Sequence, residues 1–296
     1  MIHQSNLGKG SALKTGFAYV IKNIPEAEGC VTADSDGQHS INCIKKIVEA
    51  LETNSQNLIL GVRDFDKSIV PVKSYMGNIL TQRIFKYLEG SNIKDTQTGL
   101  RGIPNNFMKE CLLLSGKRFE FEMQMLILAI EKVKITQVPI KTIYDSRFRH
   151  STHFKALKDS LSIYKVLGKK FFAYIFSSFS SFLVDILLFT LFLRIFADFS
   201  EKYMIILATI CSRAFSLCYN YMCNYIFVFK SDARIFKSII QYLILAAVQM
   251  IFSFSLVISV KMLFTMGNIV GIKVVVDVFL FIISYLIQQR YIFKKE

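Results

Sequence analysis

Hydrophobic and polar positions divide this chain into two halves with different patterns. Up to about residue 170, charged and apolar residues are mixed as in a globular domain. Beyond that point, long apolar runs dominate. The pattern predicts a soluble first half followed by a membrane-embedded second half.

Short apolar runs alternate with amphipathic stretches in the first half. The apolar runs predict strands at 29–33, 58–62 and 135–143, and the spacing predicts helices at 40–52, 75–88 and 118–132. Strands that alternate with helices indicate an α/β fold with a mainly parallel sheet covered on both faces. In such sheets, ligands bind at the carboxyl ends of the strands.

The second half contains four apolar segments, at 171–193, 203–229, 239–264 and 269–289. Each reaches the roughly 20 residues that a helix needs to cross a bilayer, which predicts an all-α transmembrane four-helix domain. Asp185, Arg213 and Asp277 lie inside these segments and should face the bundle interior. They either bind a lipid phosphate head group, with Arg213 as the cation, or pair with one another.

Basic residues mark one side of the membrane. They precede the first segment, separate the second from the third and follow the fourth: Lys169, Lys170, Lys230, Arg234, Lys237, Arg290, Lys294 and Lys295. Since cytoplasmic loops hold the excess of Lys and Arg, both termini and the soluble half are predicted to be cytoplasmic. The chain is then a multi-pass protein of the cell membrane.

The second half also contains a repeat. Residues 220–230 align with residues 284–294, and at the same offset Asp185 falls opposite Gln249. Two helical hairpins of the same orientation are expected to pack about an axis along the membrane normal.

Composition and charge agree with a membrane protein. The chain is 52% hydrophobic with a formal net charge of +14. Membrane lipid explains this charge better than nucleic acid, so no nucleic-acid partner is expected. The six cysteines form no CxxC pair and are interpreted as small buried hydrophobic residues.

The basic segment 146–170 joins the two halves. Phe154, Leu157, Leu161 and Tyr164 fall on one face of a predicted helix, which is typical of an interfacial helix lying on anionic lipid. Arg149 and His153 could contact a lipid phosphate or have ordinary surface roles.

The strongest chemical signal is Asp34-Ser-Asp36 directly after the first predicted strand. Two carboxylates there suit Mg²⁺ or Mn²⁺, which can bridge a diphosphate and improve it as a leaving group. Ordinary turn chemistry is the alternative.

Three further segments strengthen the metal interpretation. The segment 6–16 is glycine-rich and includes Lys9, which could contact phosphate. The segment 95–102 follows a strand that ends at Arg63. The segment 119–126 contains Glu120 and Glu122, which could also be plain exposed helix charges.

In this order and spacing, residues 5–145 resemble the family 2 glycosyltransferases, in particular the dolichol- or polyprenyl-phosphate sugar synthases. Residues 171–294 resemble the GtrA-like family of four-span proteins, which is associated with polyprenyl-linked sugars. The resemblance implies a nucleotide-sugar donor, a polyprenyl phosphate acceptor and a divalent metal, Mg²⁺ or Mn²⁺. It places Asp34 and Asp36 at the metal and the nucleotide diphosphate, with Gln38 as a further metal ligand. It implies that Arg63 and Arg101 hold phosphate of the donor or the acceptor, beside Lys9 of the glycine-rich segment. The catalytic residues that it implies are Arg101 and Asp95, with Asp95 as the base.

Physical chemistry offers another role for Asp95. The second pKa of a phosphate monoester is about 6, so the acceptor is already ionised at neutral pH. A strong base is then unnecessary, and Asp95 could mainly orient an arginine.

Members of the resembled family begin with a strand, a helix and a strand that bind the nucleotide base. Here the glycine-rich loop follows closely on Met1, so the sheet is expected to be incomplete at its N-terminus. The expected domains are 1–145, glycosyltransferase-like; 146–170, juxtamembrane; and 171–296, transmembrane.

Two functional hypotheses from different classes follow. The first is inverting transfer of a hexose from a nucleotide-sugar to a polyprenyl phosphate. The second is a non-catalytic GtrA-like flippase or scaffold for lipid-linked sugars. Transfer to another acceptor and a homo-oligomeric state both stay open.

Overall fold

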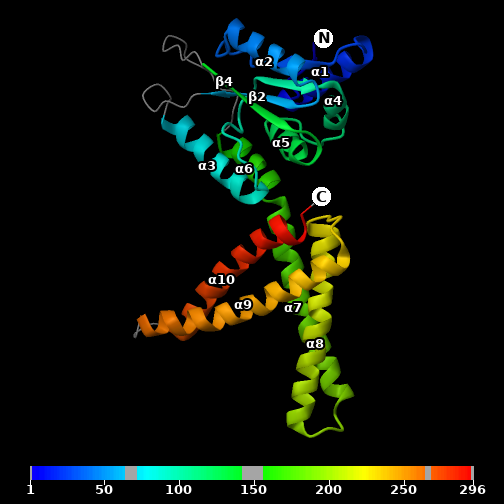
Figure 1. Cartoon of the computed structure of the whole chain (residues 1–296), viewed down its shortest axis with the longest axis vertical. Coiled ribbons are helices and arrows are strands. Elements are labelled where there is room, and N and C mark those ends of the chain that lie inside the picture. Colours follow the sequence, from blue (N-terminus) through cyan, green and yellow to red (C-terminus); the bar gives the residue numbers. More distant parts are fainter. Residues whose placement is uncertain (1, 64–71, 142–155, 264–267, 295–296) are drawn as a thin grey trace. The chain divides into compact units, whose positions relative to one another are not determined.

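The computed structural model describes residues 2–63, 72–141, 156–263 and 268–294 (Figure 1). Residues 1–168 and 169–296 form two compact units, which are described separately below.

The first unit is built on a four-stranded mixed sheet. Its strands are β1 (Gly29–Thr32), β2 (Leu58–Arg63), β3 (Arg101–Pro104) and β4 (Ile135–Ile140), in the order β1-β3-β2-β4. Strands β2 and β4 are parallel, whereas β3 runs antiparallel to both of its neighbours. The expected mainly parallel sheet is therefore corrected to a mixed one. The sequence did not reveal β3, because four residues that include Gly102 and Pro104 show no apolar period.

Helices cover both faces of this sheet. The helices of this unit in the described residues are α1 (Lys9–Asn23), α2 (Ile41–Thr53), α3 (Val72–Glu89), α4 (Asn105–Cys111), α5 (Glu120–Lys132) and α6 (Ala156–Leu167), of which α6 packs on α3 and α5. Helix α2 begins where Ser40 Oγ accepts a hydrogen bond from the backbone N–H of Cys43, and it buries Ile47 against Ile59 of β2. On the opposite face, Cys30 of β1 contacts Met108 of α4. Figure 1 shows α2 and α5 on opposite sides of the sheet.

Helix α6 packs on the first unit through a face that sequence analysis did not predict. Asp159 is buried and binds Arg118 at 2.8 and 3.1 Å, and Ile163 and Leu167 are also buried. Leu161, which belongs to the predicted apolar face, is exposed. Arg149, His153 and Phe154 lie outside the described residues.

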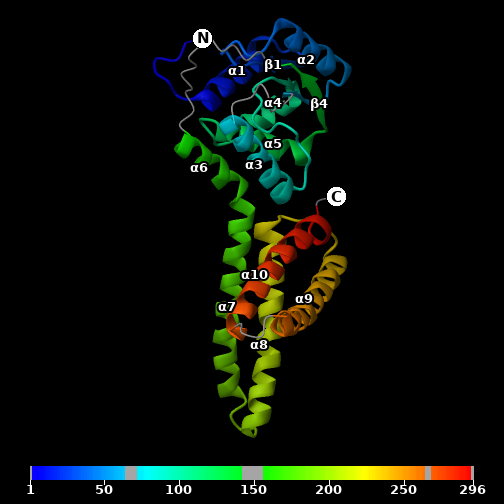
Figure 2. The same ribbon diagram turned by 90° about the vertical axis from the view of Figure 1, so that its left-hand side faces the viewer.

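The second unit consists of two helical hairpins. Helix α7 (Lys169–Ile195) pairs with α8 (Glu201–Cys223), and α9 (Ile235–Leu263) pairs with α10 (Ile269–Ile287) (Figure 2). Within the described residues, three helices are long and apolar enough to cross a membrane: Lys169–Ile195, Ile235–Leu263 and Ile269–Ile292. A helix also forms at the second predicted span, but α8 falls short of this criterion in the described chain. Its polar residues, such as Arg213 and Asn220, explain why.

The repeated segments adopt the same unusual backbone. Helices α8 and α10 both end in a π-helical turn, η1 (Asn224–Val228) and η2 (Gln288–Ile292). The first residues of these turns are 64 residues apart, and they meet: Asn224 Nδ2 donates to Gln288 Oε1 at 3.0 Å. Both side chains are buried, so this amide pair joins the hairpins where water is excluded.

Candidate functional site

The candidate site of the first unit lies where strand ends and two helix starts meet. Asp34 follows β1, Arg63 ends β2, and the segment containing Asp95 leads into β3. Lys9 begins α1 and Glu122 lies in the first turn of α5. Together they border a cavity of about 130 Å³ lined by Lys9, Asp34, Arg63, Thr96, Gln97, Phe119, Glu122, Met123 and Ile163.

Lys9 joins two carboxylates in this site. Its Nζ lies 2.7 Å from Asp34 Oδ1 and 2.9 Å from Glu122 Oε2. Burial tends to lower the pKa of Lys9, but attraction by Glu122 and Asp34 outweighs burial and leaves that pKa raised. The ammonium is therefore charged at neutral pH and balances the two anions.

Two glycines bring Lys9 to this position. Gly8 has a φ of +94°, which favours glycine, and a Cβ there would lie 2.6 Å from the carbonyl oxygen of Lys117. A Cβ on Gly10 would lie 2.6 Å from the Cβ of Phe121. The glycine-rich segment thus allows α1 to approach the start of α5.

The carboxylate of Asp34 lies directly over Gly99. A Cβ on Gly99 would be 2.2 Å from Asp34 Oδ2. Thr32 Oγ1 donates to the carbonyl oxygen of Gly99 at 3.0 Å, which attaches this segment to the end of β1. The segment before β3 therefore shapes the place that Asp34 occupies.

Asp36 and Gln38 lie in the turn after Asp34. Asp36 is exposed, and its Oδ1 accepts a hydrogen bond from the backbone N–H of Gln38 at 3.1 Å. No cluster of three or more His, Cys, Asp or Glu side chains suited to a metal occurs in the described residues. Two carboxylates and an amide oxygen are the kind of ligand that Mg²⁺ or Mn²⁺ takes, with the remaining ligands from substrate phosphates and water, so the metal site at Asp34, Asp36 and Gln38 stays a prediction.

His39 is a neighbour of this turn that sequence analysis did not single out. Burial is the main cause that lowers the pKa of the His39 imidazole, although Asp34 and Asp36 oppose it. Its Nδ1 is buried and has no hydrogen-bond partner among the described residues. The sequence signal that could have identified His39 was its position directly after Gln38, a predicted metal ligand.

Asp95 holds Arg63 through both carboxylate oxygens. Arg63 Nε donates to Oδ2 at 2.7 Å, and Nη2 donates to Oδ1 at 3.0 Å. Asp95 is fully buried, whereas the Arg63 side chain is 15% exposed and borders the cavity. This is the geometry of a residue that orients an arginine.

Arg101 lies behind the site. Its side chain is 1% exposed and donates to the carbonyl oxygens of Thr98 at 2.9 Å and Glu122 at 3.0 Å. Its Nη2 lies 3.9 Å from Glu122 Oε1. Of the three predicted phosphate-binding cations, Lys9 and Arg63 border the cavity, whereas Arg101 braces its wall.

Glu122 is the main residue whose placement the sequence left open. It was weighed as an exposed helix charge, but it is 7% exposed and contacts both Lys9 and Arg101. The available signal was its place in the first helical turn beside Phe121 and Met123, both of which are buried.

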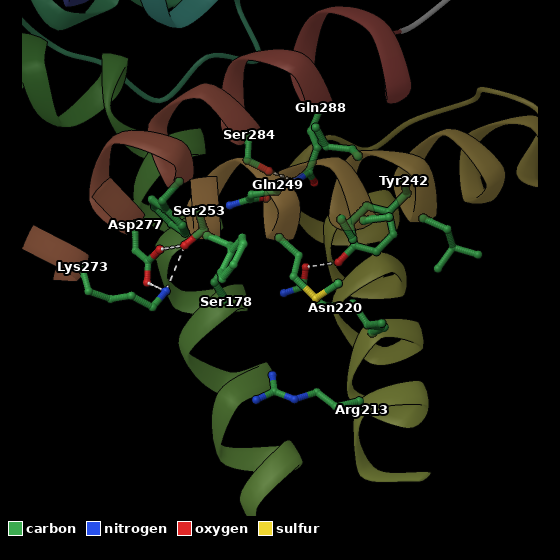
Figure 3. A pocket seen from close by; sticks show the side chains of 18 of the residues that line it. Ser178, Arg213, Asn220, Tyr242, Gln249, Ser253, Lys273, Asp277, Ser284 and Gln288 are labelled. Carbon is green, nitrogen blue, oxygen red and sulfur yellow. Dashed lines mark hydrogen bonds and ion pairs between the residues drawn. The ribbon is translucent and has the colours of Figure 1, made fainter. Parts of the chain in front are cut away.

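A second cavity lies in the second unit. It measures about 1220 Å³ and is lined by Tyr174, Ser178, Arg213, Leu217, Asn220, Tyr242, Leu243, Leu245, Ala246, Ala247, Gln249, Met250, Ser253, Phe254, Val257, Ile258, Lys273, Asp277, Phe281, Ser284 and Gln288. We call it the hairpin cleft, because both hairpins contribute to it. Figure 3 shows Lys273, Asp277 and Ser253 in contact at one end and Arg213 on α8.

Ion pairs accompany this cleft. Arg213 Nε lies 3.5 Å from Asp185 Oδ2, and Lys273 Nζ lies 2.6 Å from Asp277 Oδ2. Asp185 is buried as predicted, but Arg213 is 68% exposed and Asp277 47% exposed. The expectation that all three charges face a bundle interior is corrected: two of them line an open cleft, because the hairpins do not pack along their whole length.

Comparison with known proteins relates the first unit to sugar transfer. Residues 1–111 match the family described as Glycosyl transferase family 2. The chain is 34% identical over 151 residues to the UDP-N-acetylglucosamine--dolichyl-phosphate N-acetylglucosaminyltransferase of Methanococcus voltae. That alignment covers 48% of this chain and 58% of the relative, so the chain spans less than two thirds of that protein.

A second relative is the uncharacterized protein MJ1222 of Methanocaldococcus jannaschii. It is 29% identical over 175 residues, which cover 57% of this chain and 71% of the relative. The family match includes Lys9, Asp34, Arg63, Asp95 and Arg101. The first unit of this chain is therefore similar, over residues 1–111, to the glycosyltransferase family 2.

Proposed function

We propose that the chain transfers a sugar from a nucleotide-sugar to a polyprenyl phosphate at the cytoplasmic face of a membrane. The single observation that carries this is the cavity at the strand ends, bordered by Lys9, Asp34 and Arg63, in a unit that is similar to the glycosyltransferase family 2. The name of the Methanococcus relative supports a lipid phosphate as acceptor. The three apolar helices and the basic loops support membrane attachment.

The cavity residues suit a single displacement. An acceptor phosphate oxygen attacks the anomeric carbon of the sugar, the bond from that carbon to the donor diphosphate breaks, and the nucleoside diphosphate leaves with the electron pair. This step inverts the anomeric configuration. A divalent cation bound by Asp34, Asp36 and Gln38 would supply positive charge to the leaving group.

The chain's own cations position the phosphates. Arg63, fixed by Asp95, presents a guanidinium to the cavity, and Lys9 adds an ammonium. Arg101 keeps Glu122 and α5 in place rather than contacting a ligand. Because the acceptor phosphate ionises with a pKa of about 6, orientation and charge are expected to supply most of the rate.

The test uses the full chain in detergent with Mn²⁺, radiolabelled UDP-N-acetylglucosamine and either dolichyl or undecaprenyl phosphate. We expect labelled lipid from the parent protein and at least about a hundredfold less from Asp36→Ala, because a metal ligand is lost. Glu52→Ala, which removes an exposed acid on α2, is the matched control and should retain activity. Absence of labelled lipid with UDP- and GDP-sugars alike would contradict the proposal.

The hairpin cleft favours a second candidate function for the second unit. Its wall is mostly apolar, yet it carries Arg213 and Lys273, which are paired with Asp185 and Asp277. Charged residues on helices in lipid are costly and are typical of ligand pathways. Both cations have an exposed side chain, so they can also contact a lipid phosphate, which supports the alternative of a non-catalytic protein that moves or holds lipid-linked sugars.

Binding of undecaprenyl phosphate in the cleft can be measured by native mass spectrometry. The double variant Arg213→Gln, Lys273→Gln is expected to bind this lipid about tenfold more weakly, because two charge-assisted contacts are lost. Lys202→Gln, at the start of α8 and outside the cleft lining, should bind like the parent. If the double variant binds undecaprenyl phosphate as tightly as the parent does, the hairpin cleft is not a site for the lipid head group.

A further inference from the structure

Lys9 occupies a position on Asp34 that a bound metal ion would compete for. Its Nζ lies 2.7 Å from Asp34 Oδ1, and the same nitrogen lies 2.9 Å from Glu122 Oε2. An ammonium between two carboxylates provides the charge balance that a cation would otherwise provide. A divalent ion and an ammonium repel each other, so they cannot share this carboxylate at close range without cost.

Two carboxylates bind the Lys9 ammonium, but the site is partly open to solvent. The side chains of Lys9 and Asp34 are 24% and 30% exposed, whereas that of Glu122 is 9% exposed. The Glu122 carboxylate also faces the buried Arg101 guanidinium. Lys9 therefore has one deeply placed anchor, Glu122, and one partner nearer to the cavity, Asp34.

We propose that Lys9 is an internal counter-cation of the carboxylate site. It holds Asp34 while no divalent ion is bound, and it leaves Asp34 for a phosphate of the donor when the ion arrives. The proposal deepens the proposed function and rests on it, since the ion and the diphosphate belong to that reaction. Lys9 is then a donor-binding residue whose contact changes during binding.

The chemistry of lysine suits this exchange. Its ammonium is a compact charge on a flexible four-carbon chain, so it can move between oxygen partners without a change in the backbone. The cavity that Lys9 borders also contains Arg63, so the two cations can reach one ligand. Glu122 keeps the displaced ammonium near the site.

Direct Mn²⁺ binding tests the first half of this proposal. Free Mn²⁺ is measured by electron paramagnetic resonance on the purified full chain, without sugar or lipid. Lys9→Met is expected to bind Mn²⁺ about tenfold more tightly, since the competing cation is removed. Lys9→Arg keeps the charge and should resemble the parent. The matched control is Lys14→Met, because Lys14 is on the same helix but donates to the carbonyl oxygen of Leu114.

Binding of inorganic pyrophosphate in the presence of Mn²⁺ tests the second half. Lys9→Met should bind this probe about tenfold more weakly, because the ammonium that moves to the diphosphate is missing. Lys9→Gln retains a hydrogen-bond donor to Asp34 and provides a second neutral variant if the methionine disturbs folding. Both neutral variants should bind Mn²⁺ more tightly and pyrophosphate more weakly than the parent protein does.

The outcomes separate this proposal from the proposed function. Mn²⁺ affinity that is unchanged or lower in both neutral variants overturns the competition, as does absence of Mn²⁺ binding by every form. Unchanged pyrophosphate affinity overturns the movement of Lys9 to the donor. None of these measurements requires sugar transfer, so a protein that fails the transfer assay still gives a clear answer on Lys9.

Discussion

Replacing Gly99 with alanine is expected to reduce sugar transfer by about a hundredfold while leaving the fold intact. The new Cβ would lie 2.2 Å from Asp34 Oδ2 and 2.5 Å from its Cγ, far inside contact distance. The short side chain of Asp34 can rotate away, so the backbone need not move. Misplacement of a reacting or ligating group by about 1 Å is enough for a loss of this size.

The measurement combines labelled-lipid formation with far-UV circular dichroism on heating. Gly16→Ala is the matched control, because a Cβ there would meet nothing within 4 Å. Gly16 lies in α1, so alanine should be neutral or stabilise the helix by up to about 1 kcal/mol. If Gly99→Ala and Gly16→Ala transfer sugar equally well, the position of Asp34 does not govern the reaction.

Replacing Asp95 with asparagine is expected to destabilise the first unit by about 3 kcal/mol and to lower sugar transfer strongly. Asp95 is fully buried and binds Arg63 through both oxygens, at 2.7 and 3.0 Å. Removing one member of a buried charge pair leaves the other with much less compensation, which accounts for a cost of this order. Denaturant unfolding, followed by circular dichroism, measures the change in the free energy of unfolding.

A double-mutant cycle decides how Asp95 acts. Arg63→Lys keeps the charge but loses the two-point contact. If Asp95 works by orienting Arg63, then Asp95→Asn should reduce transfer only slightly further in the Arg63→Lys background. Losses that multiply instead would show that Asp95 acts independently, as a catalytic base would. The two roles weighed for Asp95 from the sequence are thereby separated.

The pattern of predicted strands and helices was sufficient to locate several residues of the candidate site. Asp34 was predicted directly after one strand and Arg63 at the end of another, and the structure places both at one cavity, where Asp95 binds Arg63. Parallel strands place their carboxyl ends at one edge, so this convergence follows from the order of strands and helices. Lys9 was predicted as a phosphate contact, and the structure places it at the same cavity.

The roles of the buried residues could not be read from local patterns. Arg101 was predicted to contact a ligand and the placement of Glu122 was left open, yet both side chains are buried and lie close to each other. Their burial depends on packing between β3 and α5, which are separated along the chain. The spacing of apolar residues describes one helix or strand at a time, so it does not predict contacts between two elements that are distant along the chain.

In this protein, the sequence alone determined the division into a half of mixed polarity and an apolar half and the repeat at the ends of α8 and α10. These properties depend on residue type and spacing within one segment. Only the tertiary structure decided the antiparallel insertion of β3, the buried face of α6 and the bridge from Lys9 to Asp34 and Glu122. Each of these is a contact between distant segments, and its energy depends on burial and geometry that exist only after folding.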